Sequence, residues 1–509
     1  MNLLLVVEQG RTRRWILRLA ERLSGLGVNL RLATTEANEA PIGGIELLLD
    51  LERMVLHRQR VNGADKIDTS AIAPLADAGF VPTLVVDLTA RPRARGDARV
   101  LAPTWDGIHG ETAAIARLVS GATPLCEVVD VASGEVLERG LASLENAAGL
   151  GGAIDTVAGR LVTLIATRVA AMVEGRDRPA PPHIPAVEAR ARCDVARLAA
   201  ASLAGSAARA LYRLTCWAPH WRIGWRLHDG PGIAETGNFS GPAFRVLPDP
   251  GHRFFADPFV ATRDGRTFVF VEDLDHRVGK GRISAIPFGP DGPSGEAQVV
   301  LDEPWHLSYP FLIEHAGDLW MIPESTNAGD VALYRCTRFP DRWERAATLV
   351  GGISLSDATV FEHDGRWWMF GTMHDGEGGW SDVLVIHTAP SLFGPWTALP
   401  SNPVLVDRTS ARPAGAVFRR DGRLFRPVQD CSDGYGAALA VAEITRLDDE
   451  GFAQVVRHRL APGPHWPGRK LHTVNRVGRL EVIDGSVVRP KWPWLAGVVD
   501  RATVPGGAA

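Results

Sequence analysis

A repeated segment in the second half of the chain restricts the possible folds more than any other feature of the sequence. Three stretches align without gaps, at residues 256–273, 308–325 and 356–373, and two looser copies follow at 411–430 and 470–485. In the first three copies, the second residue precedes a turn glycine by eight positions. Each copy therefore predicts a strand, a tight turn and a second strand, which together make an antiparallel hairpin.

The spacing of the copies predicts a ring of small sheets. The copies begin about 50–60 residues apart, which is enough for four strands and their turns. Further strand-like runs lie between them, such as RISAIPF, VALYRCT and VLVIHTA. Tryptophan supports this interpretation, because 13 of the 15 tryptophans lie at or after Trp217 and large aromatic side chains suit the contacts between blades. We therefore predict an all-β five-bladed β-propeller over residues 217–490.

The first half of the chain has a different pattern. Residues 1–175 alternate apolar runs such as LLLVVE at 3–8 with helix-like segments such as RWILRLAERLSGLG at 14–27. Such alternation predicts an α/β domain with a partly parallel, Rossmann-like sheet. Neither GxGxxG nor GxxxxGK[ST] follows the first strand, so the usual phosphate-binding turns are missing.

One part of this half resembles a known family. In residues 102–140 a Gly-rich turn and helix precede a strand and the hairpin DVASGEV at 130–136, an order that resembles the later part of the formyltransferase fold. That family's catalytic Asn and its His-containing loop are not recognisable here. His109 is either a relic of that site or a structural residue. The resemblance implies a formyltransferase-like domain that has lost its chemistry.

A connecting segment follows at residues 176–216. It begins with RDRPAPPHIPAVEAR, whose four prolines predict a linker. The next stretch, about 191–215, is rich in Ala and Arg and predicts a helix. This helix either lies on an anionic membrane surface or packs between domains. Residues 491–509 are predicted to be a C-terminal tail.

Charge and composition exclude several classes of protein. The formal net charge of −4 argues against a nucleic-acid partner. Five scattered cysteines encode neither a disulfide framework nor a zinc site. The apolar start, Leu3 to Val7, is too short for a signal peptide, and arginines interrupt the longer apolar stretches. We predict a cytoplasmic protein, peripheral to the inner face of the membrane if the 191–215 helix lies on lipid.

The repeat also predicts where chemistry could take place. Because each copy is an antiparallel hairpin, its first strand starts where its second strand ends, and in a propeller the innermost starts converge on the central channel. We expect these residues to surround one mouth of that channel. The members are Asp257, Tyr309, Asp357, Arg412 and His472 from the starts, and Glu272, Asp273, Glu324, Ser325, Gln429 and Asp430 from the ends. Crowded carboxylates perturb one another's pKa, which separates acid from base roles.

Several phrases of the second half resemble known propellers. ADPF, SDATVF and SLFGPWTALPSNPVL (391–405) resemble the five-bladed propellers of glycoside hydrolase family 43. The fuller pattern ADPF…VED…SYPF…PES…SDATVF…LHTVN…VIDG resembles the amino-terminal domain of glucosamine inositolphosphorylceramide transferases and their bacterial homologues. The two resemblances together cover about residues 217–490.

The resemblance to family 43 implies roles for individual residues. Its base matches Asp257 and its pKa-tuning aspartate matches Asp357. Its general acid falls at Arg412, where the chain has no carboxylate, although Glu324 or Glu272 could substitute for it. The channel histidine, which in such propellers can sit near calcium or water, matches His472.

The missing acid favours transfer over hydrolysis. A phosphate leaving group needs little protonation, so a sugar nucleotide is a suitable donor. We therefore predict an inverting sugar transferase of glycan or glycolipid biosynthesis. Asp257 would be its base, with Arg412 and Lys280 or Arg282 near the leaving group. Three alternatives stay open, namely a glycosidase with a substitute acid, a non-catalytic glycan-binding propeller and a formyl transferase in the first half.

Two further candidates lie in loops. The segment MHDGEGGWSD offers His374 and Trp380 to stack on and hydrogen-bond a sugar. Asp430 and Asp433, in QDCSDGYG, are either oxygen ligands for calcium or members of a polar turn.

Overall fold

The computed structural model describes residues 1–37, 39–56, 61–188, 194–463, 465–466 and 468–503. Contacts within the chain divide it into two units. Unit 1 holds Met1–Ala208, His374–Asp382 and Leu405–Asp407, and unit 2 holds the rest of the chain from Arg209 onward. Of the predicted 176–216 connection, Val195–Thr215 forms helix α5, whereas 189–193 lie outside the described residues.

Unit 1 is built on one six-stranded sheet with the order β2-β1-β3-β4-β5-β6. The pairs β1–β2, β1–β3 and β3–β4 are parallel, whereas β4–β5 and β5–β6 are antiparallel. The strands are β1 (Asn2–Glu8), β2 (Asn29–Thr35), β3 (Leu84–Asp87), β4 (Arg99–Trp105), β5 (Leu125–Asp130) and β6 (Val136–Leu141). The helices are α1 (Arg14–Ser24), α2 (Ile45–Val55), α3 (Glu111–Val119) and α4 (Gly149–Val173), with a short 3-10 turn at Thr69–Ala71.

The prediction of a Rossmann-like or formyltransferase-like α/β domain is wrong. A doubly wound Rossmann sheet needs successive parallel strands joined by helices, but the β3–β4 connection contains no helix and β4, β5 and β6 form an antiparallel meander. The chain as a whole is mostly β, with helices making up only 19% of it. Alternating apolar runs predicted the strands without showing their direction, because parallel and antiparallel buried strands look alike in sequence.

Helix α4 is the most buried helix of unit 1. By length and composition it could cross a membrane, but 72% of its most apolar stretch is buried within the protein, as expected of a core helix. Its Arg160 is fully buried and forms ion pairs with Asp375 and Asp382, at 2.8 and 2.9 Å. These two acids belong to the 374–382 segment, and the pairing explains why this segment is part of unit 1.

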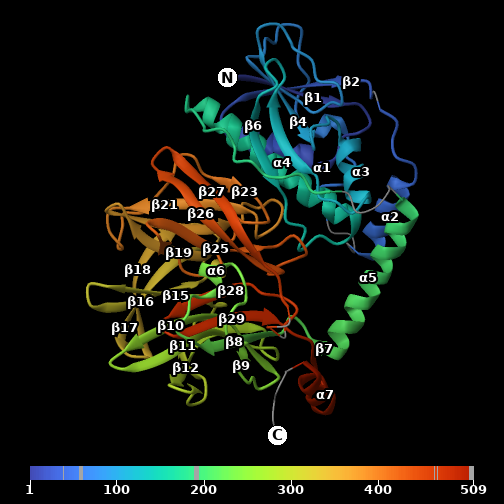
Figure 1. The fold of residues 1–509 in the computed structure, drawn as a ribbon. Coiled ribbons are helices and arrows are strands. Elements are labelled where there is room, and N and C mark those ends of the chain that lie inside the picture. The colour runs from blue at the N-terminus through green and yellow to red at the C-terminus, as the bar shows by residue number, and fades with distance from the viewer. Residues whose placement is uncertain (38, 57–60, 189–193, 464, 467, 504–509) are drawn as a thin grey trace. The chain divides into compact units, whose positions relative to one another are not determined.

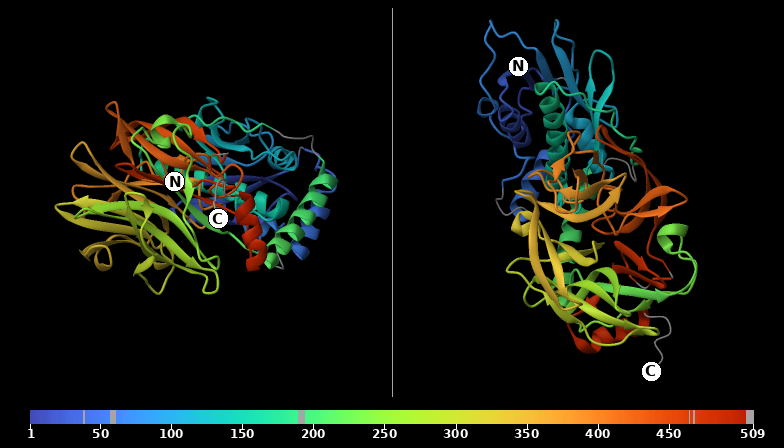
Figure 2. Two further views of the ribbon diagram at one scale, coloured as in Figure 1. Left: turned by 60° about the horizontal axis from the view of Figure 1, so that its bottom comes forward. Right: turned by 90° about the vertical axis from the view of Figure 1, so that its left-hand side faces the viewer.

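Unit 2 is a propeller. Its described residues form five sheets of at least four strands each, which confirms the predicted number of blades (Figures 1 and 2). Blade 1 is β10 (Arg253–Arg263), β11 (Arg266–Asp275), β12 (Lys280–Gly289), β13 (Gly292–Pro293) and β14 (Gln298–Leu301). Blade 2 is β15 (Ser308–His315), β16 (Asp318–Glu324), β17 (Asp330–Arg338) and β18 (Arg342–Gly351). Blade 3 is β19 (Leu355–His363), β20 (Arg366–Met373), β21 (Val383–Ala389) and β22 (Thr397–Ala398), with β23 (Leu405–Val406) off this path. Blade 4 is β24 (Phe418–Arg420), β25 (Arg423–Asp430), β26 (Ala438–Asp448) and β27 (Gly451–Leu460).

The fifth blade joins the two ends of the propeller. Its strands β28 (Thr473–Val477) and β29 (Leu480–Ser486) come from the fifth sequence copy, and β29 pairs antiparallel with β8 (Trp221–Leu227), which in turn pairs with β9 (Arg245–Val246). A small ribbon of β7 (Cys216–Trp217) and β30 (Arg489–Pro490) lies beside this closure. The sequence predicted the blade but not its partner strand β8.

Aromatic side chains fill the spaces between blades. Trp343 of blade 2 meets Phe270 of blade 1 edge to face, with ring centroids 5.7 Å apart. Trp225 of blade 5 meets Phe288 of blade 1 in the same way, also at 5.7 Å. At the hairpin turns, Asp264 and Gly265 both have positive φ, 51° and 71°, which is the type I′ geometry that suits the twist of a two-residue hairpin.

Candidate active site

The second residue of each of the first three repeats has an unusual backbone. Asp257, Tyr309 and Asp357 have φ of 51°, 41° and 56°, and each lies at a bulge where the register of the first hairpin shifts. A positive φ is costly for residues with a Cβ, and a bulge re-aims the side chain that it carries. Three equivalent positions therefore hold the same strained geometry at the start of three inner strands.

Carboxylate side chains accept hydrogen bonds from the backbone N–H groups of these bulges. The Tyr309 N–H donates to Asp257 Oδ2 at 3.2 Å, and the Asp257 N–H donates to Asp484 Oδ2 at 2.8 Å. The Asp357 N–H donates to Glu324 Oε2 at 3.2 Å. Each of these bonds joins neighbouring blades at the mouth of the channel, blade 5 to blade 1, blade 1 to blade 2 and blade 2 to blade 3. We call this set of residues, with His472, Thr473 and Arg412, the mouth ring.

Asp257 lies at the centre of one side of the mouth ring. Its Oδ1 accepts a hydrogen bond from the Thr473 hydroxyl at 2.9 Å and lies 3.3 Å from His472 Nε2. His472 Nδ1 in turn lies 2.7 Å from Asp484 Oδ1. Burial raises the pKa of Asp257 to about 7, although His472 opposes the rise. Burial disfavours the charged form of His472, but Asp484 and Asp257 outweigh it and raise its pKa to about 9.

The opposite side of the mouth ring is an ion pair. Arg412 donates from Nε to Asp357 Oδ2 at 2.6 Å and from Nη2 to Asp357 Oδ1 at 3.3 Å. Gln429 adds a third bond to Asp357, at 3.2 Å, and Glu324 lies 3.6 Å from Arg412. Burial raises the pKa of Asp357 to about 7, and Arg412 opposes this rise. The Arg412 guanidinium therefore lies beside two carboxylates, those of Asp357 and Glu324. The resemblance to family 43 implied the carboxyl group of a general acid at this position.

Aromatic side chains pack against His472 on one side of the mouth ring and against Arg412 on the other. Trp221 stacks on His472 with centroids 4.2 Å apart, and Tyr435 meets both rings edge to face. The Arg412 guanidinium lies over the Tyr435 ring at 4.7 Å. Burial raises the pKa of the Tyr435 phenol well above its ordinary value. The rings thus exclude water from the charged groups, which strengthens the interactions between those groups.

The structure places the predicted site residues in different roles. Asp257, Asp357, Arg412, His472 and Glu324 are brought together as expected. Tyr309 contributes its backbone to the ring, but its phenol is engaged by Thr359 Oγ1 and the Gly415 N–H, both at 2.9 Å. Its side chain therefore joins blades inside the channel. The prediction that it binds substrate is not tested by this geometry.

Glu272 has a partner that the sequence did not predict. His306 Nε2 lies 3.3 Å from Glu272 Oε1, while His306 Nδ1 accepts the Gly281 N–H at 2.9 Å. Because Nδ1 is the acceptor, Nε2 carries the proton that faces the carboxylate. Of the cations expected near a leaving group, Lys280 pairs with Asp302 at 2.6 Å and Arg282 lies 3.6 Å from Asp273.

The remaining candidates lie elsewhere. His374 and Trp380 stack on each other at 4.1 Å within the segment that belongs to unit 1. Asp430 accepts hydrogen bonds from the backbone and hydroxyl of Ser432 and forms an ion pair with Arg459, which is the pattern of a polar turn. The proposed roles of these three residues in substrate binding stay predictions.

Four residues at the channel mouth were not predicted from the sequence, namely Asp484, Thr473, Trp221 and Tyr435. Asp484 could have been predicted, because it lies near the end of the second strand of the fifth copy, and Glu324 ends that of the second. Thr473 is its register partner on β28. Trp221 had no comparable signal, since it enters the site through the strand β8 that closes the ring.

One group in the mouth ring has the arrangement of metal ligands. Ligand atoms of Asp257, His472 and Asp484 all lie within 4.8 Å of one another, and all three residues are buried. Calcium prefers six to eight oxygen ligands, whereas this set offers two carboxylates and one imidazole. The high pKa of His472 further favours its protonated form, which cannot bind a metal. The set therefore fits an internal ion pair better than the calcium site that the resemblance implied.

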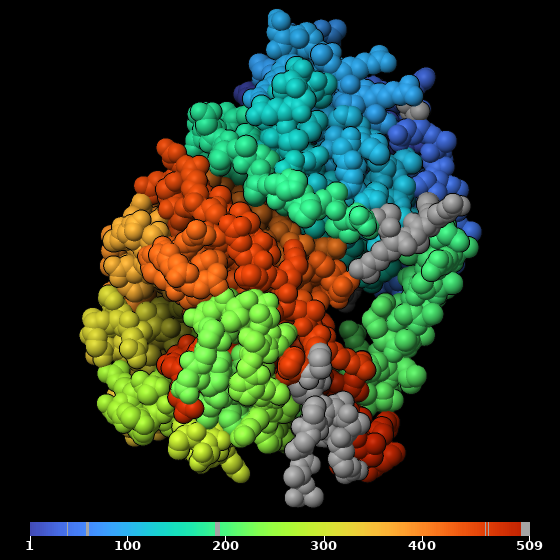
Figure 3. Space-filling model, in the orientation of Figure 1, coloured from blue at the N-terminus to red at the C-terminus, as the bar shows by residue number. Residues whose placement is uncertain are grey.

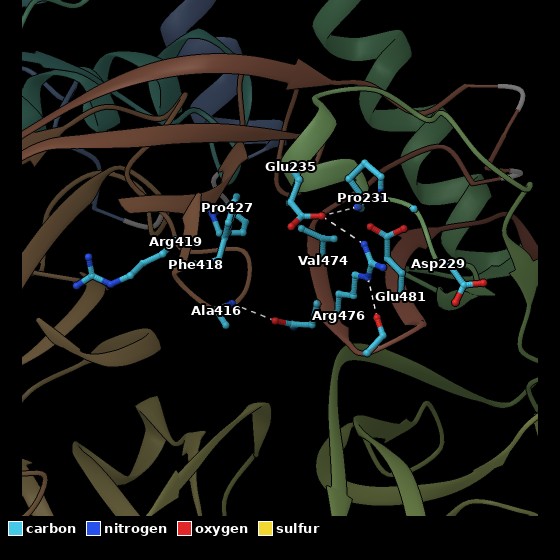
Figure 4. A pocket seen from close by; sticks show the side chains of 15 residues that line it. Asp229, Pro231, Glu235, Ala416, Phe418, Arg419, Pro427, Val474, Arg476 and Glu481 are labelled. Atoms are coloured by element: carbon cyan, nitrogen blue, oxygen red, sulfur yellow. Dashed lines mark hydrogen bonds and ion pairs between the residues drawn. The ribbon is translucent and has the colours of Figure 1, made fainter. Parts of the chain in front are cut away.

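A cavity of about 500 Å³ lies at the other end of the fifth blade (Figure 4). Its lining includes Glu235, Phe418, Asn475 and Arg476. Arg476 lies 3.3 Å from Glu235 and also donates to two backbone carbonyls. The lining also includes Val474, which directly follows Thr473 of the mouth ring, so the cavity reaches the strand that carries part of that ring.

A family model matches most of the propeller. Residues 248–485 match the family model described as glucosamine inositolphosphorylceramide transferase 1, N-terminal. The match confirms the resemblance predicted from the repeated phrases, and it spans most of the five blades.

Two plant transferases show the same likeness. Glucosamine inositolphosphorylceramide transferase 1 of Arabidopsis thaliana is 34% identical over 206 residues, which cover 40% of this chain and 27% of the relative. The protein of that name from Oryza sativa subsp. indica is 30% identical over 249 residues, covering 46% of this chain and 33% of the relative. The match thus spans a third or less of the length of these relatives. Both are plant proteins, so they give no support to a bacterial origin of the chain.

Solved glycoside hydrolases show a looser likeness. A thermostable family-43 glycoside hydrolase has 13% identity and a TM-score of 0.32, over 41% of this chain and 77% of its own. A family 117 glycoside hydrolase of Zobellia galactanivorans has 12% identity and a TM-score of 0.35, over 56% of this chain and 99% of its own. At scores this low, the assignment of the propeller rests on the strand pairing of the chain itself.

Proposed function

We propose that this chain transfers a sugar from a phosphate-activated donor to a glycolipid or glycan acceptor, and that the reaction takes place at the mouth ring of unit 2. The observation that carries the proposal is the pairing of two buried aspartates of unlike surroundings across one channel mouth. Asp257 lies beside an imidazolium, and Asp357 is locked to Arg412. The names of the plant relatives supply the substrate class.

Asp257 has the properties of a general base. A base works best when its pKa lies near the working pH, and the pKa of Asp257 is raised to about 7 by burial. In the proposed step the acceptor hydroxyl attacks the anomeric carbon and gives its proton to Asp257. The bond between the anomeric carbon and the phosphate oxygen breaks, and its electron pair leaves with the phosphate. Attack from the opposite face inverts the configuration at that carbon.

Arg412 explains why transfer is favoured over hydrolysis of a glycoside. A glycosidase needs a carboxylic acid to protonate the leaving sugar oxygen, and the place of that acid is taken by a guanidinium. The substitute acids are also engaged by cationic or donor groups, Glu324 by Arg412 at 3.6 Å and Glu272 by His306 at 3.3 Å. A phosphate leaving group needs positive charge more than it needs a proton, and Arg412 and His472 supply positive charge at the ring.

The test compares two aspartates of the same blade. The purified chain is incubated with a panel of sugar nucleotides and with glycolipid acceptors, and both the product and the free sugar are measured. Asp257→Asn is expected to lower transfer at least about a hundredfold, the usual contribution of a general base. Asp264→Asn, in the exposed turn of blade 1, is the matched control and should transfer like the unaltered chain.

Each outcome decides between functions. Equal transfer by the Asp257→Asn and Asp264→Asn variants would contradict the role of Asp257 as base. Release of free sugar from an oligosaccharide, abolished by Glu324→Gln, would favour a glycosidase. Saturable sugar binding without turnover of any donor would favour a glycan-binding propeller.

A further inference from the structure

Helix α5 (Val195–Thr215) exposes apolar side chains that a packing helix would bury. None of its residues is buried, and Leu203, Leu211 and Leu214 are 47%, 63% and 73% exposed. Together with Ala200 and Ala207 they follow one another at spacings of three and four, so they form one stripe along the helix. In Figure 3 the helix lies at the surface along its length, in green. A packing helix would turn such a stripe inward.

A second exposed apolar segment begins where α5 ends. Strands β7 and β30 pair directly after α5 and directly before α7 (Pro493–Thr503), and the Lys491 N–H donates to the Thr215 carbonyl at 2.9 Å. Lys491 Nζ donates to the Arg213 carbonyl at 2.7 Å. The start of α7 is therefore fixed beside the end of α5, as Figure 1 shows.

This junction exposes two tryptophans. Trp492, Trp494 and Val498 are 48%, 72% and 48% exposed, and the last two lie on one face of α7 at a spacing of four. Most of the other tryptophans of the propeller pack between or within blades, so an exposed pair is unusual in this chain. Tryptophan is the side chain most suited to the boundary between water and lipid, because its ring is apolar and its N–H is polar.

The charged side chains that α5 itself carries are all basic. Residues 195–215 contain Arg197, Arg209 and Arg213 and no acidic residue. Lys491 adds a fourth cation at the junction, where it also lies over the Trp217 ring at 5.0 Å. An exposed apolar stripe with basic flanks and nearby tryptophans is the pattern of a helix that lies in the surface of an anionic bilayer.

We propose that the end of α5 and the start of α7 form a membrane-docking surface, defined by Leu211, Leu214, Trp492, Trp494 and Val498, and that its partner is the headgroup region of a bilayer containing anionic lipid. The leucines and tryptophans enter the boundary between headgroups and acyl chains, and the arginines pair with lipid phosphates. This inference is independent of the proposed transfer reaction, because no residue of the mouth ring takes part in it.

The experiment is flotation of the full chain with vesicles. One set contains phosphatidylcholine alone, and the other contains phosphatidylcholine with about a quarter phosphatidylglycerol. The chain is expected to float with the anionic set and to be released by salt. Leu211→Ser with Leu214→Ser should weaken binding at least about tenfold, and Arg213→Gln about fivefold.

Matched variants and a second readout keep the test decisive. Val278→Ser, which replaces a 70% exposed apolar residue in a blade 1 turn, should float like the unaltered chain. Brominated lipid should quench part of the tryptophan fluorescence, and Trp494→Phe should remove part of that quenching. Equal flotation of the leucine double variant and Val278→Ser would overturn the proposal. It would also be overturned if the chain ignored vesicles and formed a dimer in sedimentation that the leucine variant abolished, since a second copy would then be the partner.

Discussion

The buried pair of Asp357 and Arg412 gives the sharpest prediction of stability. Asp357 is 2% exposed and Arg412 is 6% exposed, and two hydrogen bonds join them. Removing one partner of such a pair leaves a buried charge without compensation, which costs about 3–5 kcal/mol. Arg412→Leu should therefore lower the free energy of unfolding by about this amount at pH 8, measured from the midpoint of urea unfolding.

The chain contains a matched pair on its surface. Arg338 and Asp341 are joined by two bonds of 2.9 and 2.7 Å, but their side chains are 68% and 38% exposed. Water already solvates both charges, so Arg338→Leu should destabilise the protein far less than Arg412→Leu. Similar losses for Arg338→Leu and Arg412→Leu would refute the reasoning, because burial would then make no difference.

The loss in the Arg412→Leu variant should also depend on pH. Burial already raises the pKa of Asp357 to about 7, above the value of about 3.9 in an unfolded chain, and removal of Arg412 raises it further. A folded-state pKa above the unfolded one means that the folded state binds the proton more tightly, so stability falls as pH rises through that window. The variant should therefore lose less stability at pH 5 than at pH 8. A loss that grows towards acid pH would contradict this account.

Three further predictions concern the pH dependence of transfer, the contact between blades 1 and 2, and the 374–382 segment. The rate of transfer should rise with pH through about 7, as Asp257 becomes ionised, and should fall as His472 loses its proton near pH 9; a flat profile from pH 6 to 10 would argue against both roles. Trp343→Ala, which empties the contact with Phe270 between blades 1 and 2, should cost about 3–5 kcal/mol in urea unfolding, and a loss below 1 kcal/mol would show that the blades do not depend on this wedge. Arg160→Leu should expose the 374–382 segment to limited proteolysis, since two buried acids lose their partner; unchanged cleavage would mean that other contacts hold the segment.

The propeller was predictable because its information is local and repeated. Each copy carries a strand, a turn with Gly265 or its equivalent and a second strand, so the hairpin follows from residues close in sequence. The prediction for unit 1 failed because strand direction and order depend on contacts between distant segments. The closing strand β8 (Trp221–Leu227) was missed for the same reason, since its partner β29 lies at the far end of the chain.

The sequence predicted several of the residues that lie at the channel mouth. The repeat placed Asp257, Asp357 and Arg412 at one mouth, and the structure joins them through neighbouring blades. It did not predict how each side chain is used, because a hydrogen-bond partner is a property of three-dimensional geometry. Tyr309 shows the difference, since it occupies the expected place while its hydroxyl is engaged inside the channel.

The closure of the fifth blade has a consequence for the order in which the protein is made. Arg226 of β8 and Glu481 of β29 are 255 residues apart in sequence and form a buried ion pair at 2.6 Å. Synthesis proceeds from the N-terminus, so β8 must wait for almost the whole propeller before its partner emerges. His472 and Asp484, which surround Asp257, arrive with that same last blade. The mouth ring therefore cannot assemble on an unfinished chain, and the step that closes the propeller is also the step that completes the site.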